Sequence, residues 1–153
     1  MIGKKILIVE DEKSILKLES LLLTAKGCQV QGVEEGHAAL QAIRNFRPDL
    51  ILLDIMLPGL DGFEICRRIK EDRETRDIPV VMLTARNSSQ DILKGKEVGA
   101  SHYITKPFAT SVMIETVRNC LAGTPDSSLF PADFSERCMD PLSALDNMPE
   151  FPL

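Results

Sequence analysis

Hydrophobic residues in the first 122 positions alternate between short continuous runs and stretches with helical spacing. The run Ile6–Val9 is uninterrupted and rich in β-branched residues, which is typical of a strand covered on both faces of a parallel sheet. Residues 13–26 follow with apolar positions three or four apart, which predicts a helix that Gly27 ends. The apolar face expected for this helix consists of Ile15, Leu18, Leu21, Leu22 and Ala25.

The same alternation continues to residue 121. Each strand pattern is followed by a helix pattern, five times in all, which predicts an α/β fold with a doubly wound parallel sheet, right-handed crossovers and helices on both faces. The further strands are expected at residues 28–33, 50–53, 80–83 and 102–104, and the further helices at 36–46, about 63–69, 88–98 and 110–121.

Charge and composition divide the chain near residue 123. The 153-residue sequence has a net charge of −5, and all of this excess lies in residues 123–153, which contain one basic residue and six acids. Five of the nine prolines also lie there. We therefore expect a neutral domain at 1–122 and an acidic, Pro-rich tail at 123–153 that is largely disordered or docks on a partner. Neither part has the basic surface that direct nucleic-acid binding requires.

Several cellular settings are disfavoured by the sequence. No apolar run approaches the ~20 residues of a membrane helix, and the first residues lack the pattern of a signal peptide. The four cysteines form no C-x-x-C pair, so neither a zinc site nor a disulfide framework is indicated. A reducing, cytoplasmic location without membrane contact is the expectation.

Polar side chains follow four of the predicted strands. Glu10 and Asp11 follow the first strand, Asp54 the third, Thr84 the fourth, and Lys106 the fifth. Because ligands of open α/β sheets bind at the carboxyl ends of the strands, we expect these side chains to meet in one cleft. Three carboxylates and one ammonium leave a charge of −2, which a divalent cation would cancel. Oxygen ligands without His or Cys indicate Mg²⁺, with Mn²⁺ or Ca²⁺ as substitutes.

This set of groups suits phosphoryl transfer. A carboxylate such as Asp54 can attack phosphorus and form an acyl phosphate. Lys106 can hold a phosphoryl oxygen as a point charge, and the Thr84 hydroxyl can donate to another. Such reactions are accelerated mainly by positioning and charge stabilisation, so little else is needed.

Each residue alone has a simpler interpretation, because strand-end acids are often turn or N-cap residues. Three other functions also stay open. A phosphatase of another α/β family is disfavoured because Met56, not an acid, lies two residues after Asp54. A flavin or nucleotide binder is disfavoured because no G-x-G-x-x-G or Walker loop is present. The third is a protein-binding module that never takes phosphate.

Residues 4–121 resemble a response regulator receiver domain of two-component signalling. The resemblance covers nearly the whole domain and none of the tail. No motif position is missing. The matching segments are Ile6–Glu12, Asp49–Asp54, Met56–Gly62, Pro79–Ala85 and Gly99–Phe108.

The resemblance implies a flavodoxin-like sheet with strand order 2-1-3-4-5 and five helices. It also implies roles for the site residues. Asp54 would accept the phosphoryl group, Asp11 would ligate Mg²⁺ directly, Glu10 would do so through water, and Met56 would offer its backbone carbonyl. Lys106 would contact the phosphoryl group and form a cis peptide with the following proline.

The family also implies partners and a switch. A sensor histidine kinase or phosphotransfer protein would supply the phosphoryl group to a signalling phosphoacceptor, not an enzyme, that assists its own phosphorylation and dephosphorylation. Thr84 and Tyr103 would form the switch pair, with Tyr103 rotating inward from a half-buried position, and Met56 and Arg86 would tune the lifetime. The face of helix four, strand five and helix five would then bind an unidentified downstream protein or form a homodimer. The alternative is a phosphorylation-silent, receiver-like binding module.

Overall fold

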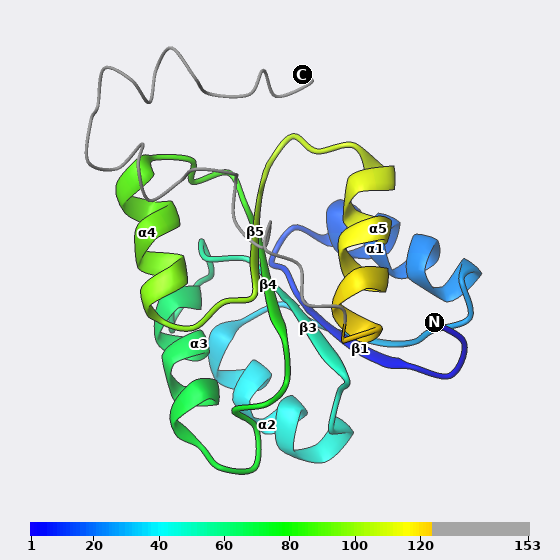
Figure 1. Ribbon diagram of the computed structural model, residues 1–153, viewed down its shortest axis with the longest axis horizontal. Coiled ribbons are helices and arrows are strands. Elements are labelled where there is room, and N and C mark those ends of the chain that lie inside the picture. The colour runs from blue at the N-terminus through cyan, green and yellow to red at the C-terminus, as the bar shows by residue number, and fades with distance from the viewer. Residues whose placement is uncertain (124–153) are drawn as a thin grey trace.

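The computed structural model describes residues 1–123. Within them, five parallel strands form one sheet in the order β2-β1-β3-β4-β5, and a helix follows each strand, as predicted (Figure 1). The expectations for the tail concern residues 124–153, which lie outside the described part. The strands are β1 Lys5–Val9, β2 Gln29–Val33, β3 Leu50–Leu53, β4 Val80–Thr84 and β5 His102–Thr105. The helices are α1 Lys13–Ala25, α2 Gly36–Phe46, α3 Gly62–Glu71, α4 Ser89–Glu97 and α5 Thr110–Leu121.

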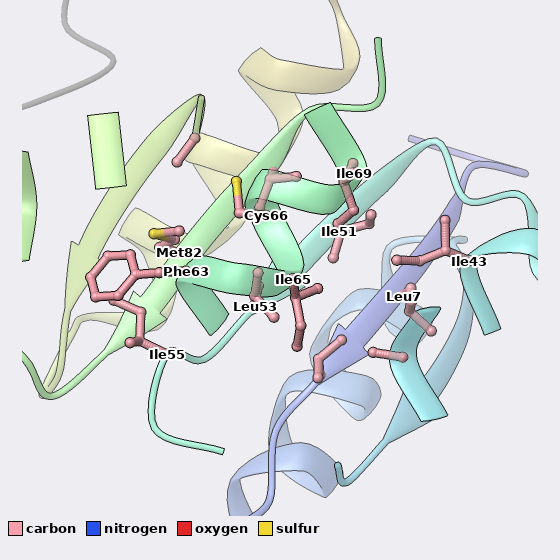
Figure 2. Packing of buried hydrophobic residues seen from close by; sticks show 14 of the residues in the cluster. Leu7, Ile43, Ile51, Leu53, Ile55, Phe63, Ile65, Cys66, Ile69 and Met82 are labelled. Carbon is pink, nitrogen blue, oxygen red and sulfur yellow. The ribbon is translucent and has the colours of Figure 1, made fainter. Parts of the chain in front are cut away.

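Helices cover both faces of the sheet, so its central strands are continuously apolar. α2, α3 and α4 lie on one side, and α1 and α5 lie on the other (Figure 1). Alternate residues of each strand enter two separate cores. Leu7, Ile51 and Met82 belong to the first core, where α2 and α3 contribute Ile43, Phe63, Ile65 and Ile69 (Figure 2). Ile6, Leu52 and Val81 belong to the second core with Leu23 of α1 and Met113 of α5.

Strand register brings the carboxyl ends of the strands together. Val9 of β1 lies beside Leu53 of β3, and Leu53 lies beside Met82 of β4. The residue that follows β3 is therefore held against its neighbour, since the Asp54 N–H donates to the Val9 carbonyl at 3.0 Å. This edge of the sheet is where the sequence places the candidate chemistry.

The prediction of which side of α1 is buried was partly wrong. Its bounds agree with the expectation, but its predicted apolar face is confirmed only in part, because Leu22 packs against the second core whereas Leu18 and Leu21 are 50% and 60% exposed. Glu19 and Leu23 are the buried residues of this helix instead. The helix carries leucines around most of its circumference, so spacing alone did not identify the side that packs on the sheet.

Glu19 is the unexpected member of the buried face of α1. Its side chain is 1% exposed, and its Oε1 atom has no hydrogen-bond partner among the described residues. Burial, together with the nearby negative charges of Glu10 and Asp54, raises its pKa to about 8, and Lys106 opposes this rise. A buried carboxyl group without a partner is stable mainly in its neutral form.

Two sequence expectations about the setting can be compared with the described residues. Cys28 and Cys66 are buried free thiols. In residues 1–123, no helix has the length and apolar character needed to cross a bilayer.

Candidate functional site

Asp54 is fixed in place by the backbone around it. It follows β3 directly, and its side chain is almost fully buried. The loop after it returns at Gly62, the first residue of α3, where an added Cβ would lie 2.5 Å from the Asp54 carbonyl oxygen and 2.6 Å from the Ile55 Cα. Only glycine allows so close an approach of two backbone segments. The Asp54 carboxylate is therefore held on a rigid element.

Both oxygens of the Asp54 carboxylate accept a hydrogen bond. The Met56 N–H donates to Oδ1 at 3.0 Å, and the Lys106 Nζ donates to Oδ2 at 3.0 Å. Lys106 also donates to Oε1 of Glu10, whose Oε2 accepts from the Glu12 N–H at 3.3 Å. One ammonium thus bridges two carboxylates that follow different strands.

A third carboxylate completes an acidic cluster. One ligand oxygen from each of Glu10, Asp11 and Asp54 lies within 4.8 Å of the other two. Glu10 and Asp54 are buried, whereas Asp11 is exposed and faces solvent. Three carboxylate oxygen donors with a single ammonium among them form a set that suits a hard cation.

In the pocket, burial and ion pairing shift the pKa values of Glu10 and Lys106 in opposite directions. Burial raises the pKa of Glu10 to about 7, the hydrogen bond from Lys106 opposes this rise, and the charge of Asp54 adds to it. Burial lowers the pKa of Lys106, but its hydrogen bonds to Glu10 and Asp54 raise the pKa by more, so the net direction is upward. Lys106 therefore stays charged, and a cation beside Glu10 would favour its ionised form.

A chain of hydrogen bonds leads away from the acidic cluster along β4 and β5. Thr84 is fully buried, and its hydroxyl accepts from the Arg86 N–H at 3.3 Å. The Tyr103 hydroxyl donates to the Arg86 carbonyl at 2.6 Å. The two residues predicted as a switch pair thus both contact the backbone of one residue, Arg86, in the loop that precedes α4.

Tyr103 lies deeper than expected from the sequence. Its side chain is 7% exposed, which is an inward position, not the half-buried one. Burial and the charge of Asp91 raise its pKa, so its hydroxyl stays protonated and able to donate. Arg86 points its guanidinium to Asp91 at 2.6 Å and lies over the Phe63 ring.

The structure brings Glu10, Asp11, Asp54 and Lys106 together, as predicted from their places after the strands. Met56 contacts the site through its backbone N–H, which donates to Asp54, and its side chain is 56% exposed. The role of its carbonyl as a metal ligand stays a prediction. The Lys106–Pro107 peptide bond is cis, as the resemblance implied. Sequence reasoning missed the packing role of Gly62, for which the Asp61-Gly62 pair gave only a turn signal.

Comparisons with known proteins agree with this geometry. The response regulator receiver domain family matches residues 6–118 of the chain. The chain belongs to this family. Receiver domains are signalling phosphoacceptors, and the pocket of Glu10, Asp11 and Asp54 is typical of them.

Individual relatives show how far the similarity extends. The phosphate regulon transcriptional regulatory protein PhoB of Pseudomonas aeruginosa is 41% identical over 144 residues, which cover 94% of this chain and 63% of that protein. A putative response regulator of Chloroflexus aurantiacus has a similar structure, with a TM-score of 0.75 and 34% identity over 78% of this chain and 98% of its own. The beryllofluoride-activated receiver domain of RstA from Klebsiella pneumoniae has a TM-score of 0.72 and 35% identity over 76% of this chain and 97% of its own. The chain thus spans less than two thirds of the length of PhoB.

Proposed function

We propose that Asp54 accepts a phosphoryl group from the phosphohistidine of a sensor histidine kinase or phosphotransfer protein, in a reaction that requires Mg²⁺. The observation that carries the proposal is the bridging of Asp54 and Glu10 by Lys106, beside Asp11. A structural ion pair would need one carboxylate for one lysine, whereas this pocket gathers three. The excess negative charge suits a site that binds a cation and transfers phosphate.

The reaction follows from the positions of these groups. An oxygen of the Asp54 carboxylate attacks phosphorus, the bond from phosphorus to the histidine nitrogen breaks, and the electron pair leaves on the imidazole. Lys106 and the Thr84 hydroxyl hold two phosphoryl oxygens. Glu10, Asp11 and Asp54, with the Met56 carbonyl, would hold Mg²⁺, which supplies charge neutralisation for the phosphoryl oxygens when bound. Water later attacks phosphorus and releases inorganic phosphate, which restores the Asp54 carboxylate.

Phosphorylation would act on the rest of the domain through Thr84 and Tyr103. The phosphoryl group adds negative charge and acceptor oxygens beside Asp54. A shift of the Thr84 hydroxyl towards them would break its bond to the Arg86 N–H and alter the carbonyl that Tyr103 contacts. The face of α4, β5 and α5 would then change shape, as a population shift between two packings.

This face is the proposed output surface. It has an exposed Val112 on α5 and a hollow of about 140 Å³ at the end of β5, lined by residues that include Ile104 and Phe108. We propose a protein partner or a second copy of the chain for this surface. PhoB is a transcriptional regulatory protein, but the neutral domain and acidic remainder of this chain favour protein partners over direct nucleic-acid contact. A histidine kinase donor implies a cytoplasmic site of action.

The proposal is tested by labelling with acetyl phosphate. The full chain is incubated with acetyl phosphate and Mg²⁺, and intact mass is measured for the wild type, Asp54→Asn and the control Asp61→Asn. Asp61 is an exposed residue whose side chain caps α3, a role that asparagine also fills. We expect one phosphoryl group on the wild type and the control, none on Asp54→Asn, and none on any protein in excess EDTA. Labelling of Asp54→Asn equal to the wild type would remove Asp54 from the acceptor role.

A further inference from the structure

The Tyr103 ring packs against α4 at a position where the helix has no side chain. Gly95 lies in α4 and is buried against the sheet. A Cβ added at Gly95 would lie 2.8 Å from Cδ2 and 3.2 Å from Cε2 of Tyr103, and 3.1 Å from the Met82 Sδ. Real Cβ atoms do not approach ring carbons so closely. The Tyr103 ring therefore occupies space that any other residue at position 95 would take.

The backbone of α4 gives no other reason for glycine at this position. Gly95 has an ordinary helical backbone conformation, unlike Gly27 and Gly99, which have φ of 92° and 97°. Glycine is among the least favourable residues inside a helix, and alanine is the most favourable. The helix thus carries an unfavourable residue at the one place where β5 presents an aromatic ring.

The ring has little freedom to avoid an added methyl group. Tyr103 pairs with the fully buried Met82 on the neighbouring strand, and its hydroxyl is held by the Arg86 carbonyl at 2.6 Å. The contact is to Cδ2, close to the backbone, so a small rotation about the end of the side chain cannot relieve it. The open alternative is rotation of the whole side chain away from α4 and towards solvent.

We propose that Gly95 is a positioning residue of the switch, which admits the Tyr103 ring beneath α4 and so permits the inward position. This inference rests on the proposed role of Tyr103 and deepens it. The size of residue 95 then sets the balance between inward and outward Tyr103. A receiver with alanine at this position would still accept phosphate at Asp54, but its output face would favour the outward arrangement.

Tyr103 provides its own probe, because the chain has one tyrosine and no tryptophan. Acrylamide quenching of tyrosine fluorescence is measured on the full chain for the wild type, Gly95→Ala and the control Lys96→Ala, an exposed neighbour on α4. We expect a shielded tyrosine in the wild type and the control, and a severalfold larger quenching constant in Gly95→Ala. Addition of beryllofluoride and Mg²⁺ should leave Gly95→Ala more accessible than the wild type. Equal shielding in Gly95→Ala and the wild type would overturn the proposal.

A double-mutant cycle separates the ring from a general effect on the helix. Unfolding by urea is followed by circular dichroism for Gly95→Ala in the wild-type, Tyr103→Phe and Tyr103→Ala backgrounds. We expect Gly95→Ala to raise the midpoint with Tyr103→Ala, where helix propensity alone acts, and to lower it or leave it unchanged in the two backgrounds that keep the ring. If Gly95→Ala alone does not fold, recovery in the double variant supports the same conclusion. A raised midpoint in all three backgrounds would contradict it.

The labelling experiment distinguishes failure of this inference from failure of the proposed function. Gly95→Ala should be labelled by acetyl phosphate as the wild type is, since residue 95 lies outside the acidic pocket. If neither protein is labelled, the phosphoacceptor proposal fails, and the fluorescence and unfolding results still decide the role of Gly95. Loss of labelling in Gly95→Ala alone would overturn its assignment to the switch.

Discussion

Glu10 and Glu19 are both buried glutamates that feel the charges of Asp54 and Lys106, yet they differ in their hydrogen-bond partners. Glu10 follows β1 and accepts hydrogen bonds from the Lys106 ammonium and the Glu12 N–H. Glu19 lies on α1 against the apolar second core, and its Oε1 has no partner among residues 1–123. Burial raises the pKa of both groups, to about 7 for Glu10 and about 8 for Glu19. Burial of an acid alone therefore does not mark the reactive site.

The difference lies in what compensates each carboxyl group. Lys106 pairs with the carboxylates of both Glu10 and Asp54, and its hydrogen bond opposes the rise in the pKa of Glu10 that burial causes. Lys106 also acts on Glu19 through its charge, but this effect is smaller than that of burial, so protonation is the means by which the fold accommodates Glu19. A functional acid is recognised by its counter-charge and its access to ligands, whereas an isolated acid in a core links folding to pH.

Removal of Lys106 is expected to have the largest effect on stability. Lys106→Met keeps the length of the side chain but leaves Glu10 and Asp54 without a cation. Breaking one side of a buried ion pair is costly, so we expect a loss of about 3 kcal/mol in the free energy of unfolding. The measurement is urea unfolding near pH 8 in EDTA.

The matched control for this substitution is Lys96→Met, at an exposed position of α4. It should change the free energy of unfolding by no more than about 0.5 kcal/mol. If Lys106→Met proved as stable as this control, the ammonium would not be what compensates the two carboxylates, and the contrast with Glu19 would collapse.

Glu19 should make stability fall as the pH rises. Its pKa is about 8 in the folded protein against 4.5 as the ordinary value, so between these limits the folded protein holds a proton that the unfolded chain has lost. The free energy of unfolding then decreases by up to about 1.4 kcal/mol per pH unit. Glu19→Gln removes this contribution and should be more stable than the wild type by about 2 kcal/mol near neutral pH, with the difference fading towards pH 4.5.

Glu10 contributes a slope of the same sign up to about pH 7, so the relevant measurement is the difference between wild type and Glu19→Gln across the pH range, in EDTA. Glu97→Gln, at an exposed position of α4, is the control and should follow the wild-type curve. Parallel curves for wild type and Glu19→Gln would show that Glu19 is ionised in the folded protein.

The exposed leucines of α1 should give the smallest effect. Leu21→Gln changes a side chain that is 60% exposed, so we expect a change of no more than about 0.5 kcal/mol in the free energy of unfolding. Leu23→Gln, two residues further and fully buried, should unfold the protein at a clearly lower urea concentration. Equal losses from the two substitutions would mean that α1 packs through the face first predicted from the sequence.

The sequence was sufficient for the sheet and for the pocket at its edge. Continuous apolar runs such as Ile6–Val9, alternating with helix patterns, are typical of strands in the middle of a parallel sheet. Once the strands are parallel, Glu10, Asp54 and Lys106 must emerge at the same edge, whatever the details of packing. The predicted site therefore depended on topology alone.

The sequence was insufficient where tertiary packing decides which of several similar side chains is buried. Leu21, Leu22 and Leu23 point in three directions, each about 100° apart around the helix, so their apolar character cannot say which one is buried. The burial of Glu19 follows from the same choice. The Tyr103 ring occupies the space beside Gly95, which lies eight residues away on another element, and no local pattern connects the two residues.

The most direct test of the phosphoacceptor account is to locate the acyl phosphate itself. The full chain is phosphorylated with acetyl phosphate and Mg²⁺, reduced with borohydride, digested and mapped by mass spectrometry. Reduction converts a phosphorylated aspartate into homoserine, so the modified position is identified covalently. We predict homoserine at position 54 and unmodified acids at positions 10 and 11. Reduction at Glu10 or Asp11, or no reduced residue despite Mg²⁺, would contradict the account.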